Sequence, residues 1–174
     1  GVGLVLLAFT GGDVDVLLKG ATPLKTVVRD DANVLNDAQR LALRDTHMKL
    51  LTGFGVDVRI LTVPGAVDIA AVAADAFRKH AVGKRSQTGE GLLFVVAPQS
   101  NAAWVEASPR TAAALGEVFM TYLRTRQMAP FLRRDKLSDG IVASLDLIYQ
   151  RAEAVRARQA FHPRQQDLLT AAAA

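Results

Sequence analysis

Three acidic side chains lie where this chain could bind a metal ion: Asp30, Asp31 and Glu90. Asp30 and Asp31 stand in a polar turn before a predicted helix, and Glu90 lies between two glycines just before an apolar run. Ligands of open α/β sheets bind in loops at strand ends, and carboxylate oxygens are ligands that Ca²⁺ and Mg²⁺ prefer. The residues therefore suggest a divalent-metal site. The alternative is that Asp30 or Asp31 only stabilises its turn by accepting hydrogen bonds from nearby backbone amides.

Other catalytic motifs are absent from the sequence. It contains no GxSxG elbow and no GxxxxGK[ST] phosphate loop. The lack of cysteine excludes disulfides, thiolate metal ligands and cysteine nucleophiles. His47, His80 and His162 are too far apart for the i, i+4 spacing that places two imidazoles on one metal, so each is expected at an exposed or edge position. Trp104 is expected to pack in the core or at its rim.

A capping box starts the helix that follows the acidic turn. Asn36 and Gln39 have the three-residue spacing that lets each side chain bond the other's backbone amide, and Gly53 and Gly55 mark the end. Helical periodicity predicts a buried face for this segment. The residues expected on that face are Ala38, Leu41, Met48 and Leu51.

Apolar runs predict a buried sheet after this helix. Residues 56–63 and 91–97 are continuous apolar strands, and a short extended segment ends near Val28. Residues 69–80 repeat apolar side chains at helical spacing, and residues 102–107 follow a turn and form the expected hairpin partner. These elements alternate strand and helix in the first half of the chain.

The last third is predicted to be helical. One helix begins after Pro109, and the residues expected to line one face of it are Leu115, Val118, Phe119 and Tyr122. Another begins at Ser138, a suitable N-cap, and the residues expected to be buried along it are Ile141, Leu145, Ile148, Tyr149, Ala152 and Val155. The element order predicts the α/β class: a three-layer α/β/α sandwich whose small mixed sheet has helices on both faces.

The positive charge is concentrated at the C-terminal end. The whole chain carries +4, and residues 121–174 hold nine Lys or Arg against five Asp or Glu, so 9 − 5 accounts for the entire excess. A solvated helix face has this pattern. Such a face could also meet anionic lipid headgroups or an acidic partner. Nucleic acid is not expected as a partner, because aromatic residues are few and no nucleic-acid-binding motif is present.

The N-terminal run GVGLVLLAF is uncharged and apolar. Nine residues cannot cross a hydrocarbon layer that needs about 20. They could be the end of a signal peptide core or of a membrane anchor, since the chain then turns polar; a buried strand is the alternative. The expected organisation is therefore an anchor or signal remnant with a linker over 1–26, a folded domain over 27–158, and a C-terminal tail over 159–174.

Several segments in order resemble the TPM domain family. They are the VxDxAxxL stretch from Val28 to Leu35, the strand VRILTV, the helix DIAAVAADAFRKHAVG, the strand GLLFVVAP and the stretch from Pro130 to Gly140. The resemblance covers about Val27 to Ala154. It implies an α/β/α sandwich and a secreted, periplasmic or lumenal location, often with a membrane tether. Members are linked to photosystem repair or serve as accessory receptor subunits, and some are reported to bind divalent cations and to show weak acid phosphatase activity.

The sequence departs from this family at the acidic motif. Members typically carry Asp-x-Gly before the third strand, whereas this chain has Gly89-Glu90-Gly91. A shift of one residue along a strand turns a side chain to the opposite face. The following strand, which usually bears a basic residue, reads Asn101-Ala102-Ala103-Trp104 here. These changes predict a degenerate site and a loop that only turns the chain.

The sequence therefore predicts a non-enzymatic accessory or scaffold subunit of a membrane protein complex, with a photosynthetic complex as one setting. It would be membrane-anchored, with the TPM-like domain on the periplasmic or lumenal side, and would use no catalytic residue and no cofactor. The alternative is a TPM-type acid phosphatase that uses Ca²⁺ or Mg²⁺ held by Asp30, Asp31 and Glu90. A third hypothesis is a binder of anionic surfaces or nucleic acid through the basic C-terminal helix.

Overall fold

The computed structural model describes residues 21–133 and 136–161. The N-terminal run GVGLVLLAF and His162 lie outside the described residues. The elements in chain order are α3 (Leu24–Val27), β1 (Val28–Asp30), α4 (Asp37–Phe54), β2 (Asp57–Thr62), α5 (Ile69–Lys79), β3 (Gly91–Ala97), the short 3-10 turn η1 (Pro98–Ser100), β4 (Ala102–Ala107), α6 (Pro109–Leu115), α7 (Glu117–Thr125), α8 (Ala129–Arg133) and α9 (Leu137–Phe161).

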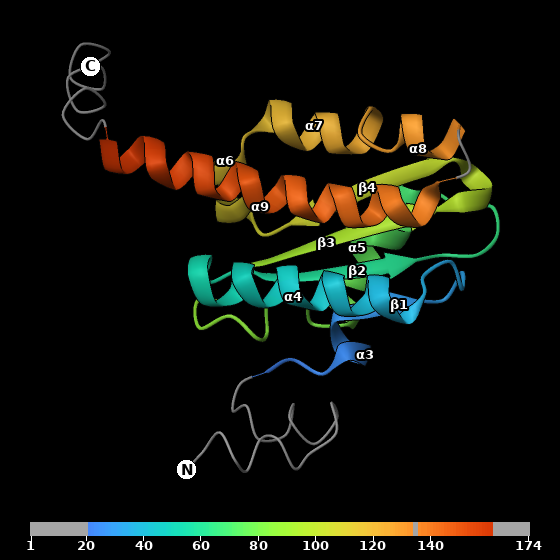
Figure 1. Ribbon diagram of the computed structural model, residues 1–174, viewed down its shortest axis with the longest axis horizontal. Coiled ribbons are helices and arrows are strands. Elements are labelled where there is room, and N and C mark those ends of the chain that lie inside the picture. Colours follow the sequence, from blue (N-terminus) through green and yellow to red (C-terminus); the bar gives the residue numbers. More distant parts are fainter. Residues whose placement is uncertain (1–20, 134–135, 162–174) are drawn as a thin grey trace.

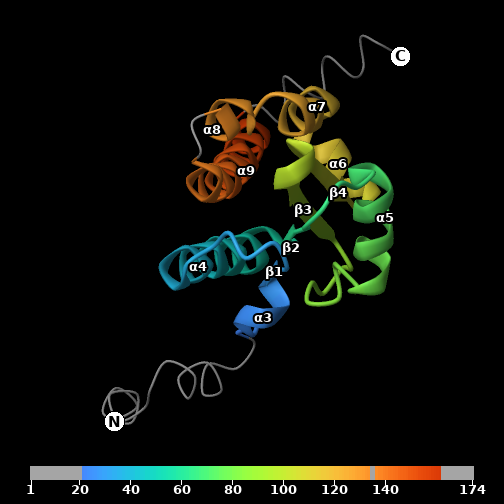
Figure 2. The ribbon, with the colours of Figure 1, turned by 90° about the vertical axis from the view of Figure 1, so that its right-hand side faces the viewer.

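The described part of the chain is a three-layer α/β/α sandwich around a four-stranded sheet of order β1-β2-β3-β4. β1, β2 and β3 are parallel, and β4 pairs antiparallel with β3, so the sheet is mixed. α4 and α9 lie side by side on one face, and α5 covers the other (Figures 1 and 2). The predicted fold class, including the hairpin of β3 with β4, is confirmed.

The two faces of the sheet carry unequal cores. Side chains of successive strand residues point to opposite faces, so Ile60 and Phe94 join the large apolar cluster under α4 and α9, whereas Leu61 and Val95 join a small one under α5. Every residue of β3 is buried. This explains why its sequence is continuously apolar rather than alternating.

The predicted start of α4 is confirmed, but its predicted buried face is wrong. The Asn36 side chain accepts a hydrogen bond from the Gln39 amide at 2.8 Å, and the Gln39 side chain accepts one from the Asn36 amide at 2.9 Å. Of the four residues expected inside, Ala38 and Leu41 are exposed and the other two are only partly buried. The residues buried in their place are Leu43, Thr46, His47 and Leu50. Two of these are polar, and partners distant in the chain decide their burial.

The single helix predicted after Pro109 is two helices, α6 and α7. Gly116 separates them with a positive φ of 98°. The break turns α7, so Met120 and Leu123 face the core while Val118 is 86% exposed. The predicted apolar face through Val118 and Tyr122 is therefore wrong.

α9 begins at Leu137, one residue before the predicted cap, and buries Ile141, Leu145 and Ile148 as expected. Gly140 sits where this helix meets α8. A β-carbon at Gly140 would lie 2.6 Å from the Phe131 ring, closer than real β-carbons approach. The helix interior needs a glycine there because of packing.

We expect Gly140→Ala to destabilise the fold although alanine is the better helix former. Overpacking of this kind costs about 1–3 kcal/mol, which exceeds the helix-propensity gain of about 1 kcal/mol. The measurement is the free energy of unfolding by chemical denaturation. Gly53→Ala in α4 is the matched control, because nothing lies within 4 Å of its β-carbon position, and it should be neutral or stabilising. A Gly140→Ala variant as stable as Gly53→Ala would show that α8 and α9 are not tightly packed.

Candidate functional site

The structure places the three candidate metal ligands at two different ends of the sheet. Asp30 is the last residue of β1 and pairs with Thr62, whereas Glu90 precedes Gly91, which pairs with Asp57. Five residues separate these two levels along the parallel strands, roughly 17 Å at about 3.3 Å per residue. The described residues contain no group of three or more acidic or histidine side chains that could hold a metal ion. Asp30, Asp31 and Glu90 are not brought together.

Both oxygens of the Asp30 carboxylate already accept hydrogen bonds from the protein. It accepts hydrogen bonds from the Val34 amide at 3.0 Å and the Leu35 amide at 2.9 Å, from the Thr62 hydroxyl at 2.6 Å, and from Arg40 at 3.0 Å. Its side chain is only 4% exposed. Burial raises its pKa, but the hydrogen bonds from Thr62, the two amides and Arg40 outweigh that effect and leave the pKa below its usual value.

Asp31 is a surface residue. It forms an ion pair with Arg29 at 3.2 Å, and both side chains are about half exposed, at 48% and 54% respectively. Such a pair contributes at most about 1 kcal/mol. Of the two adjacent aspartates, Asp30 therefore stabilises the turn and Asp31 is open to solvent.

Glu90 binds the start of α6. Its carboxylate accepts hydrogen bonds from the Thr111 hydroxyl at 2.6 Å and the Thr111 amide at 3.2 Å. The positive end of the helix dipole and an otherwise unpaired amide favour a carboxylate at this position. The expectation that the loop only turns the chain was therefore incomplete, because the loop also fastens α6 to the sheet.

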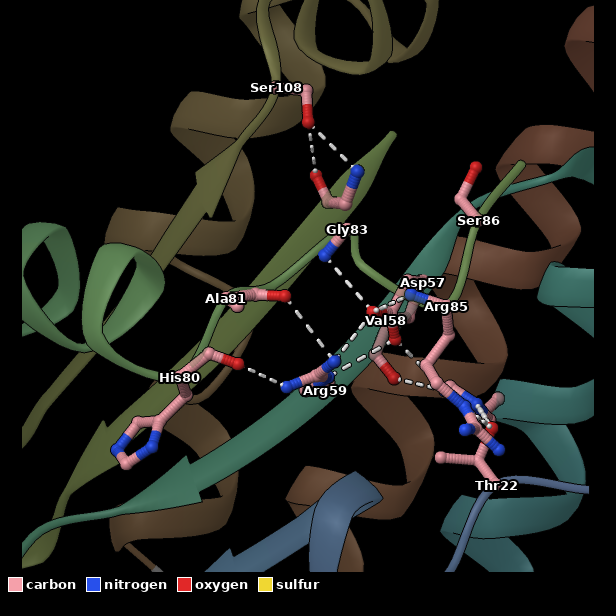
Figure 3. A network of polar contacts seen from close by, with 12 residues as sticks. Thr22, Asp57, Val58, Arg59, His80, Ala81, Gly83, Arg85, Ser86 and Ser108 are labelled. Carbon is pink, nitrogen blue, oxygen red and sulfur yellow. Dashed lines mark hydrogen bonds and ion pairs between the residues drawn. The ribbon is translucent and has the colours of Figure 1, made fainter. Parts of the chain in front are cut away.

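A buried ion pair that sequence analysis missed lies on the same sheet, on β2. Asp57 is fully buried and accepts hydrogen bonds from Arg59, at 2.8 and 3.2 Å, and from the amides of Gly83 at 3.0 Å and Arg85 at 3.2 Å (Figure 3). The Arg59 guanidinium also donates to the carbonyl of His80 at 2.5 Å. The signal in the sequence was Asp-Val-Arg inside an apolar strand, because residues two apart share a face.

His47 was expected at an exposed or edge position, and that prediction is wrong. It is fully buried under the sheet, with Nδ1 2.5 Å from the Val58 carbonyl and Nε2 2.7 Å from the Thr22 hydroxyl. A carbonyl only accepts, so Nδ1 carries the proton and Nε2 accepts from Thr22. The ring is neutral in this arrangement. Burial lowers the pKa of His47, against smaller raising effects of Val58 and Asp57.

His80 and Trp104 match their predictions. His80 lies at the end of α5 with intermediate exposure, and its imidazole points away from Asp57 and Arg59 (Figure 3). Trp104 packs at the rim of the small core, where the Arg124 guanidinium lies 4.4 Å from the ring centre. Arg124 also donates to the Val105 carbonyl, at 2.8 and 3.1 Å, and so covers part of the β4 edge.

Taken together, these contacts are those of a structural network. No buried side-chain nitrogen or oxygen among the described residues lacks a hydrogen-bond partner. Within residues 21–133 and 136–161, no helix has the length and apolar character needed to cross a bilayer.

The fold and these contacts define a compact α/β/α domain with a mixed four-stranded sheet, in which Asp30, Asp57 and Glu90 accept hydrogen bonds from protein donors. The family model described as the TPM domain matches residues 28–151, and the chain belongs to the TPM domain family. The resemblance seen in the sequence is thereby confirmed. The solution NMR structure of the N-terminal domain of a protein from P. gingivalis is similar, with a TM-score of 0.66 and 20% sequence identity, covering 80% of this chain and 88% of that one. No curated protein matches the chain.

We expect Asp30→Asn to destabilise the protein and Asp31→Asn to leave it nearly unchanged. The first change weakens a buried acceptor of two amides, Thr62 and Arg40, at a cost of about 1–3 kcal/mol, whereas the second removes only an exposed pair. Chemical denaturation of both variants measures the difference. Equal losses would contradict the assignment of a turn-stabilising role to Asp30 alone.

The stability should fall on acidification in two windows. His47 has a pKa lowered from 6.5, so its contribution is fully present above pH 6.5 and is lost as pH falls towards the lowered value. His80 acts in the same direction. Asp30, with a pKa lowered from 3.8, adds a second loss below pH 3.8. The free energy of unfolding measured from about pH 7.5 to pH 3 tests this.

His80→Gln separates the two histidines. Because His47 remains, this variant should keep part of the slope below pH 6.5. A slope that disappears with His80 would contradict the neutral, buried state of His47.

Proposed function

We propose that this TPM domain is a non-enzymatic accessory domain of a membrane protein complex, on the periplasmic or lumenal side of the membrane. The observation that carries the proposal is the occupation of the candidate metal ligands by protein donors. Asp30 holds a turn together, and Glu90 holds the first turn of α6.

Metal binding would have to displace these hydrogen bonds. Ca²⁺ needs six to eight oxygen ligands at about 2.3–2.6 Å. An ion at Glu90 would compete with the amide and hydroxyl of Thr111, and an ion at Asp30 would compete with two amides and an arginine. Since Asp30 and Glu90 stand at different ends of the sheet, one ion cannot use both. This favours a binding role over a metal-dependent reaction.

An exposed apolar surface on α7 supports a protein partner. Val118 is 86% exposed and Tyr122 is 42% exposed, and both line a hollow of about 370 Å³. The other lining residues are Glu117, Thr121, Thr125 and Arg126. Large apolar side chains gathered on one exposed helix commonly mark protein interaction sites. We call this surface, made of those six residues, the α7 patch.

The basic C-terminal segment supports a lipid-binding role less than its charge suggests. Arg151 donates to the Leu115 carbonyl at 2.9 Å, and Arg156 donates to the Gly53 carbonyl at 2.7 Å. The guanidinium of Arg156 also lies 4.0 Å from the centre of the Phe54 ring. Two of the cations counted in the sequence therefore fasten α9 to α6 and α4. The proposed attachment to a membrane rests instead on the apolar N-terminal run.

We expect the full-length protein, purified from its native membrane in mild detergent, to bring membrane subunits with it in stoichiometric amounts. Val118→Glu should reduce their recovery, because it places a charge in the α7 patch. Leu41→Glu, at an exposed apolar position on α4, is the matched control and should leave recovery unchanged. Mass spectrometry of the purified material measures both.

The outcome that would contradict an accessory role is catalysis. The matching family model is named for a phosphatase, so the second candidate function is a Ca²⁺- or Mg²⁺-dependent phosphatase. Calorimetric titration with each ion and hydrolysis of p-nitrophenyl phosphate test it. Turnover that is lost in Glu90→Gln, and kept in Asp75→Asn at an exposed carboxylate of α5, would establish the phosphatase and refute the accessory role.

A further inference from the structure

An open pocket of about 300 Å³ lies on the face of the sheet that α5 covers. α5 packs on β3 and β4 and leaves β1 and β2 uncovered on that side. The pocket lies between α3 and the end of α5, and its lining includes Lys25, Arg29, Arg59 and His80. None of its lining residues is acidic.

Two of these cations, Lys25 and Arg29, have N–H groups that bind no acceptor among the described residues. Within the described part of the chain, the Lys25 ammonium forms no hydrogen bond or ion pair, and Arg29 is bonded only through Nε, to Asp31 at 3.2 Å. Its two terminal nitrogens thus have no acceptor among the described residues. A guanidinium with two parallel N–H groups matches a carboxylate in geometry.

The charge around the pocket is positive. The charged side chains in it and beside it are the cations Lys25, Arg29, Arg59 and Lys79 and the carboxylates Asp31 and Asp57. With His80 neutral, 4 − 2 leaves an excess of two positive charges. Asp57 offsets Arg59 directly, so the uncompensated charge lies towards Lys25 and Lys79.

We propose that this pocket binds acidic side chains of a protein partner, with an Asp or Glu carboxylate contacted by Lys25 and the terminal nitrogens of Arg29. We infer a carboxylate rather than a phosphate from the hydrogen bonds that backbone amides beside the pocket already make. Phosphate groups are commonly held by successive backbone amides of a glycine-containing loop. Here the amides of Gly83 and Arg85 already bind the protein's own carboxylate, Asp57. Side-chain cations remain, and these suit a carboxylate.

The pKa of His80 should change when a ligand occupies the pocket. Burial lowers its pKa, and Arg29, Lys79 and Arg59 lower it further, while Asp31 raises it. A bound carboxylate adds negative charge among these cations, so the pKa of His80 rises on binding. By linkage, binding of an acidic peptide should tighten as pH falls below 6.5, the ordinary value from which the pKa of His80 is lowered, towards about pH 5.5, where peptide carboxylates stay ionised.

The test is an NMR titration of the protein with a blocked hexaglutamate peptide, at low salt, following the His80 ring protons and the backbone amides of α3 and β1. We expect saturable chemical-shift changes there and a higher pKa for His80 in the complex. Lys25→Gln should bind the peptide about tenfold more weakly, because it loses one charged hydrogen bond. Lys49→Gln is the matched control. Lys49 is an exposed lysine on α4, on the other face of the sheet, and its loss should change affinity less than twofold. Both lysines are exposed, so both variants should fold.

Equal weakening by Lys25→Gln and Lys49→Gln would overturn the proposal, because it would show only general attraction to a basic protein. An absence of binding would overturn it too. Inorganic phosphate is titrated in parallel, and tighter binding of phosphate than of peptide at this pocket would reassign the ligand class. The proposal rests on the accessory role only in taking a protein as the source of the carboxylate. Phosphatase turnover would refute that role without altering the peptide titration.

Discussion

The buried ion pair between Asp57 and Arg59 is the constraint on which the rest of the domain depends. Both residues lie on β2, on the face of the sheet that only α5 covers. Burial removes water from both ions, so the pair is stable only if good hydrogen bonds replace the lost hydration. Asp57 receives them from Arg59 and from the amides of Gly83 and Arg85. The pair therefore fixes the loop between α5 and β3 against the strand. That loop in turn delivers Glu90 to the N-terminal end of β3.

The same loop connects this pair to the N-terminal part of the domain. Arg85 donates to the Ala21 carbonyl at 2.9 Å, and Thr22 donates to His47 on α4. Residues 21–22, which precede α3, are thus held to α4 and to the loop by one chain of polar contacts. Such a network is stable only when every member has its partners, as is the case among the described residues. Its members position elements and leave few polar groups for chemistry.

Unequal coverage of the two faces explains where recognition could occur. α4 and α9 close one face over a large apolar cluster, whereas α5 alone leaves β1 and β2 partly open on the other. The open area is lined by cations, since Arg29 and Arg59 lie on the neighbouring strands β1 and β2 and both line the pocket on that face. The α7 patch belongs to the opposite layer. The domain therefore presents two surfaces of different chemistry, one with exposed apolar side chains on α7 and one lined by cations.

Contacts within a few residues were determined by the sequence. The capping box of Asn36 and Gln39, the apolar strands of residues 56–63 and 91–97 and the α/β/α class follow from periodicity and local hydrogen bonds, which need no knowledge of distant segments. The family resemblance rested on the same strands and on their order. A single helix was predicted across Gly116, and the break there that turns the face of α7 was not foreseen.

Contacts between distant residues were decided only by the tertiary structure. His47 is buried because Thr22 and Val58 supply its partners, and Glu90 is a helix cap because Thr111 lies opposite it. In the sequence, Asp30 and Glu90 both stood next to strands, Asp30 at the end of one and Glu90 before another. Parallel pairing places a residue that ends β1 and one that precedes β3 at different ends of the sheet, and no local pattern encodes that separation. The burial cost of a polar group depends on which donors and acceptors the fold brings to it, and those come from elsewhere in the chain.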